Sequence, residues 1–183
     1  KINLLSLETE TFSLVRSLVG KDKSTVMIVE VGANTTDISI VDKGIPMLSR
    51  SIDIGGLTIT KAISNSLNVG LERAEQFKYD LGIGSLNPSS SAIPKTITET
   101  ISPIINEIKY ALNLFQGKKD VLVEKIILSG GSALLANFPQ YLSKILDKKV
   151  IVGDPWARVS CPLDLKPILE EIGPSMSAAV GLA

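Results

Sequence analysis

The segment Glu30-Val-Gly-Ala-Asn-Thr-Thr-Asp37 interrupts two strand-like runs with a short turn rich in hydroxyl and amide groups. Before it, residues 25–29 form a continuous apolar run, which predicts a strand covered on both faces. After it, residues 37–42 alternate between apolar and polar side chains, and Lys43-Gly-Ile-Pro predicts a turn into a third strand at residues 47–54. The sequence therefore predicts a meander of three strands around this segment.

The turn itself carries groups that suit a phosphate ligand. Gly32 lets the backbone approach a ligand closely, and Asn34, Thr35 and Thr36 supply amides and hydroxyls that donate to phosphate oxygens. Glu30, two residues before the glycine, is placed to hold a metal-bound water. An ordinary hairpin turn rich in Asn and Thr has the same composition, so the segment alone leaves both interpretations open.

Composition excludes several classes of function. The chain has 183 residues, with 19 basic and 19 acidic side chains, so no net charge attracts nucleic acid or an anionic membrane. It has no histidine and a single cysteine, Cys161, which rules out a zinc site, a histidine-dependent triad and an internal disulfide, and suits a reducing cytosol. The chain does not begin with methionine, and we interpret it as a fragment of a longer protein.

The remaining segments predict helices packed on the sheet. Apolar residues recur at helical spacing in several stretches, such as Leu4, Leu7, Leu14 and Leu18, and glycine and proline residues set their ends. The predicted helices are residues 1–20, 58–67, 71–81, 97–115 and 137–146 and one from Pro174, with strands at 123–128 and 149–152 and a loop at 82–94. This order is typical of a layered α/β fold with a mixed sheet flanked by helices.

Two further features are candidate binding elements. The strand at 123–128 is followed by Ser129, Gly130, Gly131 and Ser132, and paired glycines between a strand and a helix bring backbone amides against a ligand. Glu75 and Lys78 lie one turn apart on the predicted helix 71–81. Most pairs with this spacing are surface salt bridges, so the spacing alone does not indicate a ligand.

Taken together, these patterns resemble the superfamily of actin, sugar kinases and heat-shock chaperone ATPases. The segment Glu30–Asp37 resembles its second phosphate loop, Ile126-Ile-Leu-Ser-Gly-Gly-Ser132 its adenosine loop, and Ala178-Ala-Val-Gly-Leu-Ala183 its second connecting helix. Ala74-Glu-Gln-Phe-Lys78 resembles the helix that places a Glu and a Lys on the ribose and adenine in bacterial members.

Within this superfamily the chain is similar to the FtsA-like PilM family of type IV pilus assembly. The similarity rests on Asp53-Ile-Gly-Gly56, Gly153-Asp-Pro-Trp-Ala-Arg-Val159 and Leu165-Lys-Pro-Ile-Leu-Glu-Glu-Ile-Gly-Pro-Ser175. It implies the second-half lobe of an actin-like ATPase, with a ribonuclease H-like core at residues 1–56 and 95–183 and an inserted small helical subdomain at 57–94. The other lobe, which carries the first phosphate loop, is absent from this sequence.

The resemblance also implies a bound nucleotide. Gly32, Ala33, Asn34, Thr35 and Thr36 are expected to donate to the β- and γ-phosphates of ATP. Ser129, Gly130, Gly131 and Ser132, with Glu75 and Lys78, are expected to hold the nucleoside, and Mg²⁺ is expected among phosphates and waters.

Two acids are expected to act in catalysis. Glu10 falls where the family positions the attacking water, and Glu30 is expected to act on the metal through a water. The family usually has aspartate at the position of Glu30, so the extra methylene puts hydrolysis, rather than binding, in question.

The implied function is a nucleotide-dependent cytoplasmic scaffold in type IV pilus assembly, at most a slow ATPase. Its expected partner is the cytoplasmic tail of an inner-membrane pilus assembly protein, which brings it to the membrane indirectly, and self-association is possible; no nucleic-acid partner is expected. Three alternatives remain: an FtsA-like filament-forming division protein, a phosphotransferase of the same superfamily, and a degenerate lobe that binds peptide without hydrolysing ATP.

Overall fold

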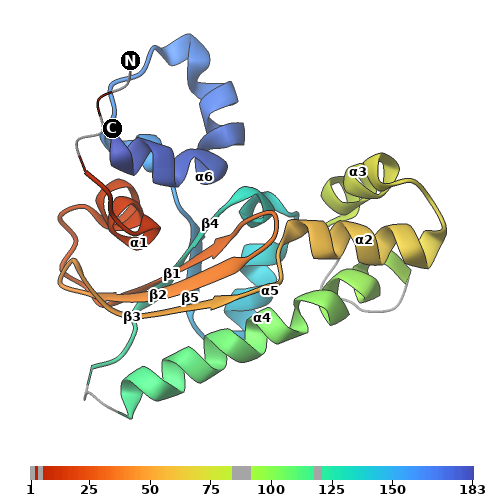
Figure 1. Cartoon of the computed structure of the whole chain (residues 1–183), viewed down its shortest axis with the longest axis horizontal. Helices are drawn as coiled ribbons and strands as arrows, with labels where there is room; N and C mark the ends of the chain where they lie inside the picture. The colour runs from red at the N-terminus through yellow and green to blue at the C-terminus, as the bar shows by residue number, and fades with distance from the viewer. Residues whose placement is uncertain (1–2, 4–5, 84–91, 118–120) are drawn as a thin grey trace.

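The computed structural model describes residues 3, 6–83, 92–117 and 121–183, and its centre is a five-stranded mixed sheet (Figure 1). The strands are β1 (Val26–Val31), β2 (Thr36–Asp42), β3 (Ile45–Ile52), β4 (Lys125–Ser129) and β5 (Lys149–Val152), in the spatial order β3-β2-β1-β4-β5. The first three form an antiparallel meander, whereas β4 and β5 run parallel to β1. The predicted mixed sheet flanked by helices is confirmed.

Helices cover both faces of this sheet. The α-helices are α1 (Glu10–Leu14), α2 (Gly56–Leu67), α3 (Leu71–Leu81), α4 (Ala92–Gln116), α5 (Phe138–Leu146) and α6 (Lys166–Leu182). A π-helical turn η1 (Val15–Val19) continues α1, and 3₁₀ turns occur at η2 (Gly131–Leu134), η3 (Pro155–Arg158) and η4 (Leu163–Leu165). In Figure 1, α1 and α6 lie on one face of the sheet, α4 and α5 lie on the other, and α2 and α3 project from its edge.

Alternation along β1 divides the core into two parts. Val26 and Ile28 pack with Leu14 and Val19 under α1 and η1, while Met27 and Val29 belong to the larger core with α2, α4 and α5. Successive side chains of a strand point to opposite faces of the sheet. Even-numbered residues of β1 therefore face α1 and η1, and odd-numbered residues face the larger core. Glu30 is therefore on the face of α1 and α6.

Three predicted helix boundaries are wrong. The first helix begins at Glu10, not at residue 1: Leu7 is 85% exposed, and Leu4 lies outside the described residues. The helix predicted from residue 97 begins at Ala92, and the one predicted from Pro174 begins at Lys166. Each of these helices encloses a proline, Pro103 in α4 and Pro174 in α6, because tertiary packing outweighs the one backbone hydrogen bond that each proline removes.

Smaller differences concern strand and helix ends. The third strand begins at Ile45, directly after the two-residue turn of Lys43 and Gly44, both of which have positive φ. The strand predicted at 123–128 is observed as Lys125–Ser129. The second helix begins at Gly56 rather than near Thr58, whose hydroxyl accepts from the Gly55 amide.

The apolar residues of α3 do not all face inward. Ala74 is fully buried, but Leu71 and Leu81 are exposed, and Lys78 points inward with Ala74. Ile59 and Ile63 of α2 and Ala74 belong to the same buried cluster as the sheet. The separation of residues 57–94 as a subdomain therefore stays a prediction. No helix among the described residues is long and apolar enough to cross a membrane.

Candidate nucleotide site

The turn between β1 and β2 exposes unpaired amides. Its ends are closed by a hydrogen bond from the Gly32 amide to the Thr35 carbonyl, at 3.0 Å. Ala33 and Asn34 at the tip are exposed, and the amides of Ala33, Asn34 and Thr35 make no hydrogen bond to the residues that the structure describes. Adjacent free amides of this kind suit an anionic ligand.

The same turn is fixed against the start of α2. The Gly56 amide donates to the Gly32 carbonyl at 2.8 Å, and the Leu57 amide donates to the Ala33 carbonyl at 2.8 Å. A Cβ on Gly55 would lie 2.6 Å from the Ala33 carbonyl oxygen, so only glycine allows this approach. The turn is therefore held from behind while its amides stay free.

The two threonine hydroxyls of the turn differ in what they do. Thr36 is fully buried, and its hydroxyl donates to the Ile54 carbonyl at 2.6 Å. The Thr35 hydroxyl donates to the Asp37 carboxylate over 3.3 Å, at a partly open position. Thr36 thus ties the turn to the end of β3, and in this conformation its hydroxyl is not free for phosphate.

Lys78 is buried, so the interpretation of Glu75 and Lys78 as a surface pair is wrong for the lysine. Lys78 is 2% exposed. Its ammonium donates to Glu75 Oε1 at 2.6 Å, to Thr60 Oγ1 at 3.1 Å and to the Gly56 carbonyl at 3.3 Å. The second Glu75 oxygen accepts from the Thr60 hydroxyl. Three hydrogen bonds thus hold the ammonium group of Lys78 beside the start of α2.

The two glycines after β4 have different surroundings. Gly130 is anchored to α6, whereas Gly131 is on the side of α2 and α3. The Ser129 hydroxyl and the Gly130 amide both donate to the Pro174 carbonyl of α6, at 3.0 and 2.9 Å. Gly130 has φ +81°, and a Cβ there would lie 2.3 Å from the Val31 carbonyl oxygen. Gly131 is partly open: a Cβ there would meet only the Tyr79 hydroxyl, at 3.7 Å.

The predicted elements converge on Gly56. A Cβ built on this residue would lie 2.6 Å from Ser132 Oγ, 3.4 Å from Lys78 Nζ and 3.6 Å from the Gly32 carbonyl oxygen. These three atoms belong to the loop after β4, to α3 and to the turn after β1. The structure therefore brings the phosphate turn, the glycine loop and the charged pair to one place at the ends of β1 and β4.

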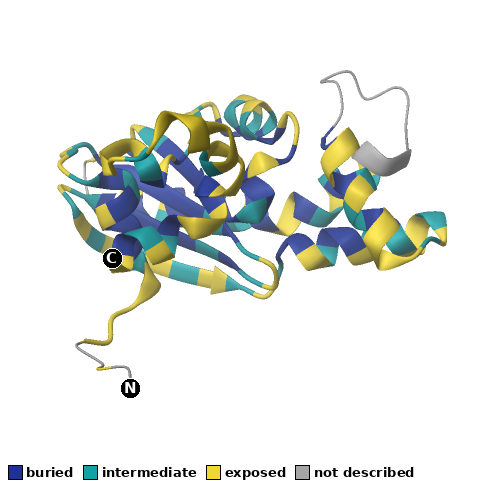
Figure 2. Ribbon diagram, turned by 90° about the horizontal axis from the view of Figure 1, so that it is seen from above, coloured by how far each residue is buried: buried dark blue, intermediate teal, exposed yellow. Residues whose placement is uncertain are grey.

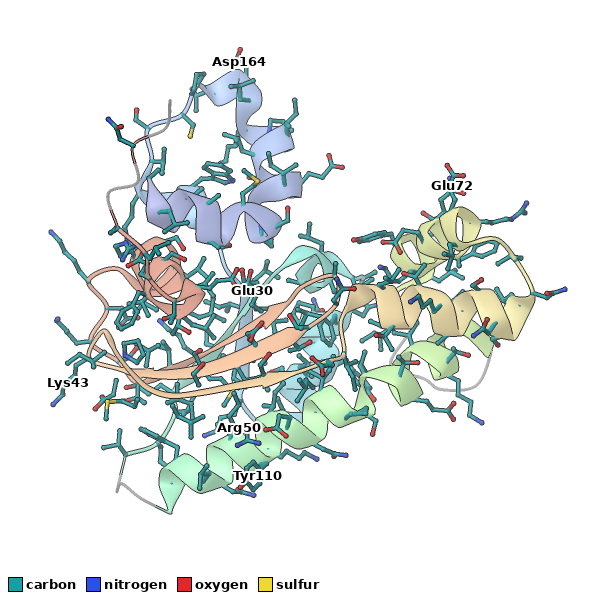
Figure 3. All side chains as sticks on the ribbon, in the orientation of Figure 1. Glu30, Lys43, Arg50, Glu72, Tyr110 and Asp164 are labelled. Carbon is teal, nitrogen blue, oxygen red and sulfur yellow. The ribbon has the colours of Figure 1, made fainter. Side chains whose placement is uncertain are left out.

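Three acids lie together on the neighbouring face of the sheet. Glu30 and Asp37 are directly opposite each other on β1 and β2, and Figure 3 shows Glu30 on the side toward α1 and α6. Burial, reinforced by the nearby charges of Glu10 and Asp37, raises the pKa of Glu30 to about 7. One of its oxygens, Oε2, is buried and has no hydrogen-bond partner among the described residues.

These groups fit a magnesium nucleotide better than a metal bound by protein alone. No group of three or more Asp, Glu, Cys or His side chains in the described chain is arranged to hold a metal ion. Mg²⁺ usually keeps waters and phosphate oxygens with one or two carboxylates, and the unpaired oxygen of Glu30 suits contact with such a water. The free amides of the turn suit the phosphates.

A separate cavity of about 520 Å³ contains none of the predicted site residues. It is lined in part by Arg16 and Arg158, whose guanidinium groups are already bonded within the chain. Arg16 donates to Glu8 and to the Gly181 carbonyl, and Arg158 to the carbonyls of Ser17 and Val19. This cavity therefore offers no comparable set of free donors.

Comparison with known protein families identifies the family of this chain. The model of the family described as type IV pilus assembly protein PilM matches residues 6–183. The chain belongs to the PilM family. Among curated relatives, the cell division protein FtsA of Neisseria meningitidis serogroup B is 27% identical over 150 residues, which cover 71% of this chain and 36% of that protein.

Solved structures show the same fold as this PilM family member. A structure titled PilM-PilN type IV pilus biogenesis complex matches with a TM-score of 0.80 and 22% identity, covering 97% of this chain and 52% of that chain. MreB 5 of Spiroplasma citri bound to AMPPNP matches with a TM-score of 0.72 and 17% identity, covering 98% and 58%. The chain thus has the fold of an actin-like lobe and spans about half of these proteins or less.

Sequence reasoning missed four residues of the site. Gly56 and Thr60 contact Lys78, Asp37 faces Glu30, and Pro174 accepts from the glycine loop. Asp37 had a readable signal, since a turn of four residues between antiparallel strands sets it opposite Glu30. The carbonyl of Pro174 had none, because it is a backbone atom brought in from a distant helix.

Proposed function

We propose that this chain is the nucleotide-binding half of an actin-like scaffold that binds ATP and Mg²⁺ and acts in type IV pilus assembly. The observation that carries the proposal is the convergence of the β1–β2 turn, the glycine loop and buried Lys78 around Gly56. Membership of the PilM family supports the biological setting.

Each group has a distinct role in this proposal. The amides of Ala33, Asn34 and Thr35 donate to the β- and γ-phosphates, each charge-assisted bond contributing roughly 1.5–3 kcal/mol. Gly131 and Ser132, with Glu75 and Lys78, hold the nucleoside. Ser129 and Gly130 position this loop through Pro174, and Gly32 and Thr36 shape the turn.

The acids serve the metal and the water. When bound with the nucleotide, Mg²⁺ would supply positive charge beside the phosphates. Glu30 holds a water beside the metal, and Glu10, which lies close enough to raise the pKa of Glu30, orients the attacking water. The extra methylene of glutamate relative to aspartate makes this a slow ATPase at most.

The proposed partner is the cytoplasmic tail of an inner-membrane pilus assembly protein, which places the scaffold at the membrane only indirectly. The similar structure titled as a PilM-PilN complex supports this assignment. Self-association is also proposed, and no nucleic acid is involved. Closure of the two lobes on ATP changes the surface that the scaffold presents to partners.

Nucleotide binding is tested by calorimetry with the complete protein and Gly131→Leu. A Cβ at residue 131 has space, 3.7 Å from the Tyr79 hydroxyl, and the rest of the leucine side chain should block the nucleoside site, so ATP and ADP affinity should fall at least about tenfold. Gly70→Leu is the matched control, because nothing lies within 4 Å of a Cβ there. Absence of ATP binding by the unmodified protein, with capture of the pilus tail intact, would favour a degenerate peptide-binding lobe.

The FtsA-like alternative is favoured by the similarity to FtsA and is tested separately. Capture of the cytoplasmic pilus tail by the complete protein supports the pilus scaffold. ATP-dependent filaments without capture of that tail would support the division protein instead.

A further inference from the structure

Tyr79, the residue after Lys78 on α3, contacts both elements that are proposed to hold the nucleoside. Its hydroxyl lies 3.7 Å from the position that a Cβ on Gly131 would take, so it reaches the glycine loop. The ammonium nitrogen of Lys78 lies over its ring, 4.9 Å from the ring centroid. The Tyr79 side chain therefore spans the space between α3 and the loop after β4.

The position of Tyr79 is fixed by the packing of the end of α3. The Ile83 amide donates to the Ala136 carbonyl at 2.9 Å, and a Cβ on Gly82 would lie 2.4 Å from the same carbonyl oxygen. These contacts hold the last turn of α3 directly against the segment that follows the glycine loop. A ligand that binds here meets a ring already in place, so little entropy is lost in ordering it.

The Tyr79 ring is only partly covered. Ala74 and Lys78 are the buried residues of α3, and Figure 2 shows the rest of this projecting helix mostly in the colours of exposed and intermediate residues. Tyr79 itself is 42% exposed, although buried Lys78 covers one face of its ring. Burial, reinforced by the negative charge of Glu75, raises the pKa of the Tyr79 hydroxyl, which therefore keeps its proton at neutral pH. An uncharged aromatic surface is thus open beside the proposed site.

Lys78 has no spare donor for a base in this conformation. An ammonium group has three N–H donors, and those of Lys78 bond to Glu75, Thr60 and the Gly56 carbonyl. A hydrogen bond from Lys78 to a nucleobase would break one of these. The Glu75 side chain is 41% exposed, and its carboxylate suits the hydroxyl groups of a ribose. The base therefore needs a contact of another kind, which the Tyr79 ring can supply.

The chemistry of an open aromatic ring matches a nucleobase. Bases stack on aromatic side chains, and this contact accepts any base because every base has a π-face. Ribose and phosphate groups have no such face, so a ligand that stacks here has to include the base. The phosphates meet the free amides of the β1–β2 turn instead. The two ends of a nucleotide thus find different kinds of group in this site.

We propose that Tyr79 is the base-binding residue of this chain, and that the base of the nucleotide stacks on the ring face that Lys78 leaves open. This inference rests on the proposed nucleotide binding and adds the contact that holds the base. Stacking does not distinguish one base from another, so Tyr79 contributes equally to the affinity for ATP and for GTP. Lys78 supports the ring from its other face.

Calorimetry of the complete protein with Mg²⁺ compares the binding of ATP, ADP, GTP and inorganic tripolyphosphate. Tyr79→Ala should weaken the three nucleotides about tenfold each and leave tripolyphosphate, which has no base, unchanged. Tyr79→Phe keeps the ring and should stay within about twofold of the unmodified protein. Tyr110→Ala is the matched control and should change nothing. Tyr110 is 51% exposed and has the Arg50 guanidinium 4.8 Å from its ring centroid, but it lies on α4 (Figure 3).

Every other outcome overturns the stacking role of Tyr79. Unchanged ATP affinity in Tyr79→Ala, with ATP bound by the unmodified protein, would remove Tyr79 from the site and leave the proposed function standing. Equal loss of ATP and tripolyphosphate would mean that Tyr79 only maintains the fold of the site. Equal loss of ATP affinity in Tyr79→Phe would assign the contact to the hydroxyl, and tighter binding by Tyr79→Ala would show that the ring blocks the site. Absence of ATP binding by the unmodified protein would overturn the proposed function as well.

Discussion

Lys78 Nζ lies 2.6 Å from Glu75 Oε1, and the lysine is buried although the glutamate is partly open. The lysine uses its three donors on Glu75, Thr60 and the Gly56 carbonyl, and so connects α3 to the start of α2. A pair at this spacing is usually an exposed salt bridge. Here the burial of the ammonium group beside the glycine loop makes it both a packing element and a ligand candidate.

Lys78→Ala should therefore change stability and binding together. Loss of its hydrogen bonds and packing should lower the free energy of unfolding by about 1–3 kcal/mol. ATP and ADP affinity in the complete protein should fall by similar factors. The proposed contacts of Glu75 and Lys78 are with the nucleoside, which both nucleotides share, and not with the γ-phosphate. Chemical denaturation and calorimetry measure the two effects.

Lys95→Ala is the control for that experiment, because Lys95 and Glu99 form an exposed pair at i,i+4. It should cost less than about 0.5 kcal/mol and leave nucleotide affinity unchanged. Equal affinities for Lys78→Ala and the unmodified protein would remove Lys78 from the nucleoside site, whatever its effect on stability.

Two glycines with nearly the same positive φ should respond differently to alanine. Gly44 has φ +80° with nothing within 4 Å of a Cβ, and Gly130 has φ +81° with the Val31 carbonyl oxygen 2.3 Å away. Gly44→Ala should cost about 1–2 kcal/mol of stability from backbone strain alone. Gly130→Ala should cost clearly more, because the clash is added. Similar unfolding midpoints for the two variants would show that the loop after β4 relaxes freely.

The meander and the phosphate turn were predictable because their signals are local. β-branched alternation and the turn residues around Gly44 determine three neighbouring strands, and the paired glycines mark both loops. The start of the helix containing Pro174 was not predictable in this way. Proline normally marks a helix start, and only packing against Trp156 and α1 explains why α6 begins at Lys166.

Several members of the candidate site were predictable, but the hydrogen bonds that they make were not. The motif identified Thr36, Ser129 and Lys78, whereas the direction of each donor depends on atoms remote in sequence. Thr36 and Ser129 bond to the backbone of Ile54 and Pro174. The acceptors of these hydrogen bonds are backbone carbonyl groups. Every residue has one, so the sequence does not indicate which carbonyl is used.

The raised pKa of Glu30 predicts a pH dependence of stability. An unfolded glutamate titrates near 4.5 and folded Glu30 near 7, so the folded state binds the extra proton between these values. Stability from this group is therefore fully present below about pH 4.5 and is lost as pH rises through 7. Glu30→Gln should flatten the urea midpoint between pH 5 and about pH 8 relative to the unmodified protein.

Two carboxyls with lowered pKa values, Glu8 and Asp22, affect stability in a different pH range. The pKa values of Glu8 and Asp22 are lowered by hydrogen bonds from Arg16 and Lys125, so these groups affect stability only at pH values below the ordinary range of a carboxyl. A pH profile of Glu30→Gln that is parallel to that of the unmodified protein would show that Glu30 titrates normally.

Glu30→Asp tests whether the longer side chain limits hydrolysis. In the resembled family an aspartate holds a water beside Mg²⁺ and the γ-phosphate, whereas glutamate reaches one methylene farther toward that place. A shift of about 1 Å in a reacting group can cost on the order of 100-fold in rate. Shortening the side chain should restore the water, and single-turnover hydrolysis by the complete protein should rise at least several-fold with little change in ATP affinity.

Glu124→Asp, at an exposed position before β4, is the matched control and should leave the rate unchanged. If Glu30→Asp leaves turnover flat or lowers it while binding is intact, the glutamate does not limit the reaction. The raised pKa of Glu30 then gives an alternative cause of slow hydrolysis. A carboxyl that is half protonated near pH 7 is a poor anchor for a metal-bound water. Turnover measured at pH 6 and pH 8 separates these two explanations: a limit set by side-chain length persists at both values, whereas a limit set by protonation is relieved at pH 8.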